Sequence, residues 1–267
     1  MDTKTQQQHA ETFHALHRNT DPLVLFNAWD AATARAIAKS SPAIATSSGA
    51  VAAALGYADG ENVPLDIVTG LVSRITASVS VPVSIDLEAG YGHTADAAAA
   101  SAARILQAGA VGINIEDGLS GGKRQLVGPE QHAAKIKAVR DAAQARGIRL
   151  FINARTDPFL LKFGSPDQCL DEAARRAKVY AEAGADGIFV PGLTDLALIA
   201  KFVQLTPLPV NIMVTQGVPA IADLTRVGVR RVSLGPWPMM AAMRIVGEAA
   251  AGVATSRQYG TFLQPNA

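Results

Sequence analysis

The chain has 267 residues, of which 49% are hydrophobic and 18% are charged, and its formal net charge is +1. This composition can bury a large core and excludes a disordered chain, and the lack of a basic run excludes the electrostatic signature of a protein that binds nucleic acid or an anionic membrane. The single cysteine, Cys169, excludes an internal disulfide and fits a cytoplasmic protein, and the sequence shows neither an N-terminal signal nor an apolar span typical of a membrane helix.

Short apolar runs alternate with amphipathic, alanine-rich segments along the chain. Strands are predicted at 23–26, 43–46, 83–86, 111–116, 150–154, 187–190, 209–212 and 231–234. Helices are predicted at roughly 30–39, 65–78, 94–108, 129–145, 168–183, 194–204, 218–226 and 237–250. Strands that alternate with helices predict a parallel sheet, and this number of units predicts one (β/α)8 TIM-type barrel domain over 1–267. Residues 1–20 are expected to form an N-terminal helical extension, and the last ten or so a tail.

A doubly wound α/β sheet is the alternative fold. The sequence has no G-x-G-x-x-G motif that opens a helix after the first strand, which argues against a dinucleotide site there.

Acidic residues stand at the ends of two successive predicted strands. Side chains alternate between the two faces of a strand, so Asp86 and Glu88 share one face, and Glu116 takes the same position on the next strand. Active sites of TIM barrels lie at this carboxyl end. Clustered carboxylates repel each other unless a cation compensates, and oxygen ligands without cysteine or paired histidine favour Mg²⁺, with Mn²⁺ also suitable. The alternative is that these acids are exposed loop charges.

Two further polar residues end later strands. A guanidinium at Arg155 can bind a carboxylate through two hydrogen bonds, so a metal and an arginine in one pocket predict a small anionic substrate. The alternative for Arg155 is an ion pair with Asp157 or Asp117. Asn211 ends the seventh predicted strand and either binds a substrate carboxylate or is a structural amide.

Five segments together resemble the isocitrate lyase and phosphoenolpyruvate mutase superfamily. They are Thr-Ser-Ser-Gly at 46–49, Leu-Gly-Tyr-Ala-Asp-Gly at 55–60, Asp-Leu-Glu-Ala-Gly-Tyr-Gly at 86–92, Asn-Ile-Glu-Asp at 114–117 and Asn-Ala-Arg-Thr-Asp at 153–157. The third segment is the most specific of the five. The resemblance extends from about Leu23 to Gly252, which is nearly the whole chain.

The resemblance implies a Mg²⁺-dependent barrel. Asp86 matches the direct metal ligand of the superfamily, and Asp59, Glu88 and Glu116 match the shell that holds the ion, largely through water. Members usually form homotetramers by exchanging the last helix between subunits. An apolar group in the last predicted helix, formed by Trp237, Met239, Met240 and Met243, fits a subunit interface.

The resemblance also implies the substrate contacts. Ser48 and Gly49 match the loop that binds the substrate carboxylate, and Arg155 matches the arginine that contacts the substrate, where it would act in catalysis together with Glu116. Lys123 lies in a glycine-rich segment that corresponds to the lid of the superfamily and can close over an anionic substrate. The alternative for Lys123 is a solvated basic loop.

The chain departs from the superfamily at the positions that separate its branches. The lid segment at 118–126 lacks the Cys and His of the isocitrate and methylisocitrate lyases, and Cys169 lies too far along the chain to replace that cysteine. Pro191 stands where phosphonopyruvate enzymes have a histidine. We therefore expect a lyase or hydrolase that cleaves a C–C bond in a small 2-oxo or 2-hydroxy carboxylic acid through an enolate-like intermediate. The alternatives are a phosphoenolpyruvate mutase-like P–C bond enzyme and an inactive barrel that binds metal and oxo acid.

Overall fold

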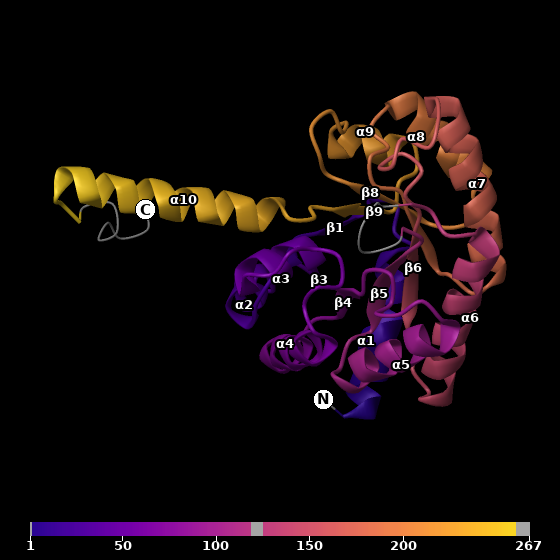
Figure 1. Cartoon of the computed structure of the whole chain (residues 1–267), viewed down its shortest axis with the longest axis horizontal. Coiled ribbons are helices and arrows are strands. Elements are labelled where there is room, and N and C mark those ends of the chain that lie inside the picture. The colour runs from indigo at the N-terminus through magenta and orange to yellow at the C-terminus, as the bar shows by residue number, and fades with distance from the viewer. Residues whose placement is uncertain (1, 119–124, 260–267) are drawn as a thin grey trace.

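Parallel strands form a nearly closed barrel with helices around it in the computed structural model, which describes residues 2–118 and 125–259 (Figure 1). The strands in these ranges are β1 Leu23–Leu25, β2 Asn27–Ala28, β3 Ile44–Thr46, β4 Val83–Asp86, β5 Gly112–Glu116, β6 Phe151–Arg155, β7 Gly187–Phe189, β8 Val210–Met213 and β9 Arg231–Ser233. The predicted TIM-type barrel is therefore confirmed.

Each of the eight predicted strands is present, but the first is divided into two. β1 pairs with β9, whereas β2 pairs with β3, and the nine-stranded sheet runs in the order β1-β9-β8-β7-β6-β5-β4-β3-β2. The two halves of one sequence run thus hydrogen-bond to opposite edges of the sheet, and Phe26 lies between them. This shared first strand brings the two edges together.

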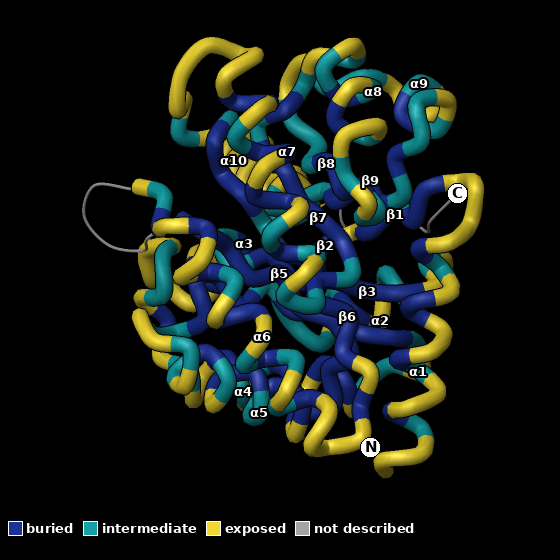
Figure 2. The backbone as a smooth tube through the Cα atoms, turned by 90° about the vertical axis from the view of Figure 1, so that its right-hand side faces the viewer, coloured by how far each residue is buried: buried dark blue, intermediate teal, exposed yellow. Residues whose placement is uncertain are grey.

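Most of the helices cover the outside of the barrel, whereas the first closes its bottom and the last extends away from it (Figure 1). In the described ranges they are α1 Thr3–Leu16, α2 Ala31–Ile37, α3 Ser48–Leu55, α4 Leu65–Ser78, α5 Ala95–Gln107, α6 Pro129–Ala145, α7 Pro166–Glu182, α8 Leu196–Leu205, α9 Ile221–Arg226 and α10 Trp237–Ser256. Figure 2 shows the result as buried inner strands and exposed outer helical turns. None of these helices is both long and apolar enough to cross a membrane.

Among the helices of the described residues, α3 is the one that the sequence analysis missed. The Ser-Gly segment there was expected to be a loop, but Ser47 caps a helix by accepting a hydrogen bond from the Ala50 amide at 3.4 Å. The alanine-rich run that follows favours helix, and Gly56 ends it with a left-handed φ of 78°. Ser48 and Gly49 therefore belong to the first turn of a helix that points at the barrel mouth.

The N-terminal extension forms α1, which closes the bottom of the barrel. Its Phe13 is fully buried and meets Phe151 of β6 edge to face, with ring centroids 5.4 Å apart, and His17 stacks on Phe151 at 3.9 Å. A Cβ atom at Gly112 would lie 2.7 Å from the Phe13 ring, so β5 needs glycine there. The lower half of the barrel interior is therefore filled by aromatic rings.

Burial of His132 between α6 and α7 makes stability depend on pH. Its ring meets Tyr180 edge to face at 4.8 Å, and burial, aided by Lys135, lowers the pKa of His132 to about 3. The unfolded chain binds this proton near pH 6.5, so the stabilisation is complete above pH 6.5 and is lost as the pH falls toward 3. The pKa of Glu88 is raised instead of lowered, so its contribution to the unfolding free energy changes with pH in the opposite direction. The contribution of His132 is therefore obtained by comparing the wild type with a variant that lacks this histidine.

We expect the wild type to lose about 2 kcal/mol more unfolding free energy than His132→Phe between pH 6.5 and pH 5, as measured by urea denaturation. The phenylalanine ring keeps the apolar contact with Tyr180 but cannot be protonated. Equal losses in the two proteins would show that His132 does not couple folding to protons.

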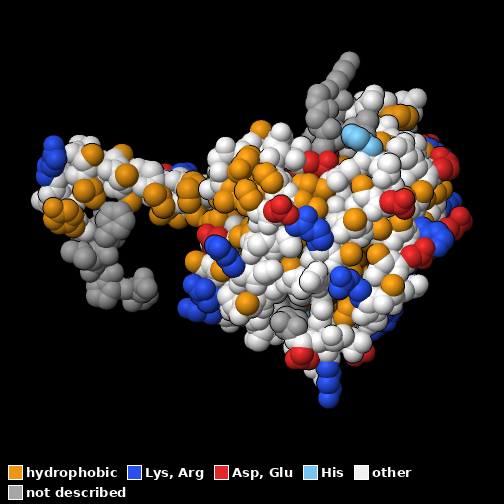
Figure 3. Space-filling view, turned by 60° about the horizontal axis from the view of Figure 1, so that its bottom comes forward, with side chains coloured by type: hydrophobic (Ala, Val, Ile, Leu, Met, Phe, Trp, Pro, Cys, Tyr) orange, Lys and Arg blue, Asp and Glu red, His pale blue; other side chains and the backbone are white. Residues whose placement is uncertain are grey.

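Helix α10 leaves the barrel as an arm (Figure 1). It begins at Trp237 as predicted but continues to Ser256 instead of ending near residue 250, and none of its residues is buried. Large apolar side chains are exposed along it, namely Trp237, Met240, Met243, Ile245 and Val246, and Figure 3 shows orange side chains along the arm. The predicted tail falls mostly in 260–267, outside the described residues.

Candidate active site

A cavity of about 210 Å³ opens at the carboxyl ends of the strands. Its lining comes from most of the barrel and comprises Asn27, Ser47, Ser48, Gly49, Asp59, Asp86, Asn114, Arg155, Leu160, Phe189, Met213, Ser233, Gly235 and Pro236. Five residues that the sequence analysis placed in the site, Ser48, Gly49, Asp59, Asp86 and Arg155, are thus brought to one cavity. This is the end of a TIM barrel at which active sites lie.

Asp86 ends β4 and is oriented by its neighbours. Its backbone N–H donates to Thr46 Oγ1 at 3.0 Å, and its Oδ2 accepts from the Ser48 amide at 3.1 Å. The other carboxylate oxygen, Oδ1, is buried and has no hydrogen-bond partner among the described residues. A buried carboxylate oxygen without a partner is costly unless a cation or donor binds it. This oxygen therefore fits a Mg²⁺ ion, which prefers such ligands.

The other acidic residues lie around Asp86 without forming a complete cage. Asp59 faces the start of α3, where a Cβ atom at Gly49 would lie 3.6 Å from Asp59 Oδ2. In the described ranges, no three Asp, Glu, His or Cys side chains are close enough together to hold a metal ion directly. The arrangement thus suits a hydrated ion, with Asp86 as the direct ligand and the other carboxylates reached through water.

Glu88 approaches Asp86 from a turn and not from a strand, because β4 ends at Asp86. It has a left-handed φ of 51°, and its carboxylate accepts from the Glu61 amide at 2.6 Å and the Tyr91 hydroxyl at 3.3 Å. Burial, together with the charges of Asp86 and Asp59, raises the pKa of Glu88 to about 7. A nearby cation would relieve this repulsion and lower the pKa of Glu88 again.

Arg155 stands opposite Glu116 in the register of β5 and β6 and is held on two sides. Its Nη1 lies 2.6 Å from Glu116 Oε2, and it binds Asp157 through Nε at 2.7 Å and Nη2 at 2.9 Å. Burial disfavours the charged guanidinium, but Glu116 and Asp157 outweigh it and raise the pKa of Arg155. The Asp157 pair is one of the alternatives anticipated from sequence, yet Arg155 also lines the cavity.

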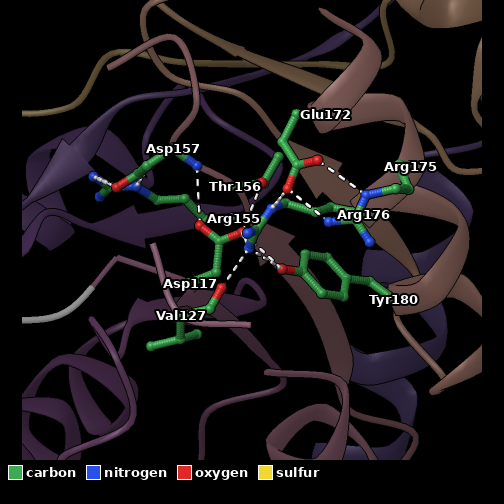
Figure 4. Close-up of polar contacts among 9 residues, drawn as sticks. All are labelled: Asp117, Val127, Arg155, Thr156, Asp157, Glu172, Arg175, Arg176 and Tyr180. Carbon is green, nitrogen blue, oxygen red and sulfur yellow. Dashed lines mark hydrogen bonds and ion pairs between the residues drawn. The ribbon is translucent and has the colours of Figure 1, made fainter. Parts of the chain in front are cut away.

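A buried network behind Arg155 fixes the ends of β5 and β6 to α7 (Figure 4). Asp117 is fully buried and accepts from Thr156 Oγ1 at 2.7 Å, the Asp157 amide at 3.0 Å, Arg176 Nη1 at 3.0 Å and Tyr180 Oη at 2.7 Å. Because Asp157 in turn holds Arg155, the network fixes the direction of the guanidinium. The sequence analysis missed Arg176 and Tyr180, which lie some sixty residues further along the chain than Asp117.

We expect Asp117→Asn to destabilise the protein by about 3 kcal/mol, measured by urea denaturation, because the Arg176 charge would then be buried beside a neutral amide. The control is Asp223→Asn, which breaks an exposed ion pair with Arg226 and should cost less than about 1 kcal/mol. Similar small losses in both variants would contradict a structural role for Asp117.

Lys135 of α6 anchors the turn that carries Glu88. It is 3% exposed, and its Nζ donates to the carbonyl oxygens of Ala89 at 2.8 Å and Gly92 at 2.7 Å. The sequence analysis missed this residue, although a lysine on the apolar face of a predicted helix, between His132 and Val139, was a usable signal.

The remaining predicted residues lie elsewhere. Asn211 is buried beneath the cavity, where its Oδ1 accepts from Ser233 Oγ at 3.2 Å. Cys169 is buried on α7, with Sγ 3.4 Å from the Pro158 carbonyl oxygen. Lys123 falls in 119–124, outside the described residues.

The comparisons with known proteins agree with the geometry. A profile of the phosphoenolpyruvate phosphomutase family matches residues 13–254. An uncharacterised protein of Mycobacterium tuberculosis is 36% identical over 250 residues, covering 92% of this chain and 90% of its own. The 2-methylisocitrate lyase of Escherichia coli is 33% identical over 179 residues (65% and 58%), and an oxaloacetate decarboxylase of Rhodopseudomonas palustris is 31% identical over 208 residues (73% and 66%).

Solved structures show the same fold. A candidate phosphonomutase from Burkholderia cenocepacia is 41% identical, with a TM-score of 0.87 and coverage of 91% of this chain and 99% of its own. A 2,3-dimethylmalate lyase is 25% identical, with a TM-score of 0.82 and coverage of 97% and 90%. The resemblance predicted from the five sequence segments is confirmed, and the chain belongs to the phosphoenolpyruvate phosphomutase family within the isocitrate lyase and phosphoenolpyruvate mutase superfamily.

Proposed function

We propose that the protein is a Mg²⁺-dependent lyase or hydrolase that cleaves a C–C bond in a small 2-oxo or 2-hydroxy carboxylic acid. One observation carries the proposal: the unpartnered Asp86 Oδ1 and the Arg155 guanidinium belong to one cavity. The first suits a cation and the second suits an anion, so together they suit a carboxylate substrate with a divalent ion. The cavity of about 210 Å³ suits a small molecule.

The proposed roles follow from the positions of the side chains. Asp86 would hold Mg²⁺ directly, with Asp59, Glu88 and Glu116 holding it through water, and Mn²⁺ could replace it. When bound, the ion would polarise the substrate carbonyl and so favour an enolate-like intermediate.

Four residues would bind the substrate around this ion, namely Ser48, Gly49, Arg155 and Asn211. The Ser48 amide already donates to Asp86, so the Gly49 amide and the Ser48 hydroxyl remain for the substrate carboxylate at the start of α3. Arg155 would bind the substrate and stabilise developing negative charge. We propose that Lys123 closes over the site and that Asn211 supports the carboxylate from below.

The relatives favour C–C chemistry but leave a second candidate. The names of the lyase and decarboxylase relatives describe reactions of small carboxylic acids, whereas the 41% identity to a candidate phosphonomutase favours a P–C bond enzyme. Pro191 weakens that second reading, because a proline cannot give the phosphoryl group the contact of a histidine. A barrel that binds metal and oxo acid without turnover is the third candidate.

A substrate panel separates these candidates. The purified protein with Mg²⁺ is incubated with oxaloacetate, methylisocitrate, dimethylmalate and phosphonopyruvate, and product is read by pyruvate release and phosphorus NMR. A blank without protein corrects for the spontaneous loss of CO₂ from oxaloacetate. Turnover of any of the first three supports the proposal. Turnover of phosphonopyruvate alone favours the P–C enzyme, and binding of oxalate without turnover favours the inactive barrel.

We further propose that the protein is a homotetramer in which α10 packs on a neighbouring subunit. The exposed apolar side chains of α10, including Met240, Ile245 and Val246, need a partner surface. Light scattering after size exclusion should give about four times the 27.7 kDa chain mass. A monomer at micromolar concentration would contradict the proposal.

A further inference from the structure

A buried arginine lies directly beneath the cavity, where the polar groups of several strands meet. Arg231 of β9 is 1% exposed, and it is among the largest fully buried side chains of the described residues. It donates from Nε to Ser233 Oγ at 3.1 Å and from Nη2 to Asn114 Oδ1 at 3.2 Å. Both partners line the cavity, whereas Arg231 itself does not. Arg231 therefore does not contact a ligand in the cavity directly, and its hydrogen bonds reach the cavity through these two side chains.

The direction of these hydrogen bonds is fixed by chemistry. A guanidinium has five donors and no acceptor, so the Asn114 atom that it binds must be the amide oxygen. The same oxygen accepts a second hydrogen bond, from Asn153 Nδ2 at 2.9 Å. With both bonds on its oxygen, Asn114 keeps its NH₂ group for the cavity, and no acceptor for that group is found within the described ranges. Asn114 is also the register partner of Asp86.

The second chain of hydrogen bonds, from Arg231 through Ser233 to Asn211, has the same donor-to-acceptor direction. Ser233 Oγ accepts from Arg231 and so donates its own proton to Asn211 Oδ1 at 3.2 Å. This leaves Asn211 Nδ2 as a buried donor without a partner in the described part of the chain. Both branches that start at Arg231 thus end in amide N–H groups. Of the two residues that carry them, Asn114 and Asn211, only Asn114 lines the cavity, and an amide donor there suits a carboxylate oxygen and disfavours a cation.

The positive charge of Arg231 also favours an anionic ligand over a cation. Burial lowers the pKa of Arg231 to about 9, against the opposing effect of Asp86, so the guanidinium stays protonated at neutral pH. A positive charge below the cavity attracts an anionic substrate and repels a metal ion at Asp86. The effects of Arg231 on the two ligands are therefore expected to have opposite signs.

We propose that Arg231 is a positioning residue that turns the NH₂ group of Asn114 into the cavity, where it donates a hydrogen bond to a carboxylate group of the substrate. Asn114 thereby becomes a binding residue for the substrate, and Arg231 sets its orientation without touching the ligand. The proposal rests on the proposed function in one respect, namely that the ligand is a small carboxylate.

The test measures two ligands separately by calorimetry: Mg²⁺ alone, and oxalate at saturating Mg²⁺. In Arg231→Met, oxalate should bind about 10- to 100-fold more weakly, while Mg²⁺ should bind as tightly as in the wild type or more tightly. Arg231→Lys keeps the charge but not the fork of donors, so its loss should be intermediate. The control, Arg226→Met, removes an arginine that is 70% exposed and should change neither constant. The proposal would be overturned if Arg231→Met bound both Mg²⁺ and oxalate more weakly to a similar degree, or if its affinity for oxalate were unchanged.

A readout without ligand keeps the inference separate from the proposed function. The side-chain amide signal of Asn114, assigned by its loss in Asn114→Asp, should shift or broaden in ¹H–¹⁵N spectra of Arg231→Met and Arg231→Lys. An unchanged signal in either folded variant would refute the role of Arg231. If the wild type bound neither Mg²⁺ nor oxalate, the proposed function would fail, and the amide signal would still decide whether Arg231 orients Asn114.

Discussion

Replacing Asp86 with alanine should abolish Mg²⁺-dependent turnover, with kcat/KM falling by about a thousandfold or more. The reason is that Asp86 carries the one buried carboxylate oxygen in the described part of the cavity lining that lacks a hydrogen-bond partner. The measurement is the initial rate on the best substrate of the panel, over a range of Mg²⁺ concentrations and after EDTA treatment.

A second readout for Asp86 does not depend on substrate. An ion that binds only the folded state stabilises it, by about 2.7 kcal/mol at one hundred times its dissociation constant. Mg²⁺ should therefore raise the Tm of the wild type but not that of Asp86→Ala. The matched control is Asp141→Ala, which removes an exposed aspartate paired with Lys137. Full activity of Asp86→Ala, or a wild type indifferent to EDTA, would refute the assignment of the metal site.

Arg155→Met should lower both activity and stability. The variant would remove the guanidinium that contacts Glu116 and Asp157, which are 5% and 1% exposed, and so would take a paired positive charge out of a buried cluster. Such a loss costs about 3–5 kcal/mol of unfolding free energy. Turnover should fall by about a hundredfold or more in kcat/KM, because the charge that stabilises the developing anion is removed. Urea denaturation and steady-state kinetics measure the two effects.

The two effects of Arg155 can be separated with a conservative variant. Arg155→Lys keeps one positive charge between the carboxylates, so it should recover most of the stability, but it cannot bind both Asp157 oxygens and a substrate in one plane. Activity should therefore stay low in Arg155→Lys. Arg175→Met, at an arginine that is 51% exposed, serves as the control. Full activity in Arg155→Lys would show that only charge is needed at this position.

Much of the fold was predictable because local sequence patterns determine most of its strands and helices. Apolar runs and helical periodicity located all eight barrel strands and most of the helices. The division of the first strand into β1 and β2 was not predictable, since it depends on which distant strand each half pairs with. Helix α3 was missed because Ser48 and Gly49 are typical of loops, and only the capping bond from Ala50 to Ser47 shows that a helix starts there.

The candidate site was predictable where its residues lie on strands, but its long-range contacts were not. Strand alternation placed Asp86 and Glu116 at one mouth, since both lie on strands whose faces can be read from sequence. Glu88 reached the same region by a different route, because the strand ends before it and the Glu61 amide holds its carboxylate. The contacts of Asp117 with Tyr180 and of Lys135 with Ala89 join residues 63 and 46 positions apart, and no periodicity records such contacts.

The aromatic filling beneath the barrel has a consequence for the chemistry at the opposite end. Phe13 and Phe151 exclude water from the lower interior, so the layer that contains Arg231 and Asn114 lies in a medium of low dielectric constant, where charges act over longer distances. Helix α1, whose Phe13 contacts Phe151 and does not line the cavity, thus helps to set the electrostatic potential that a ligand meets there. Removal of α1 would hydrate the interior from below and weaken that potential without changing any residue of the cavity.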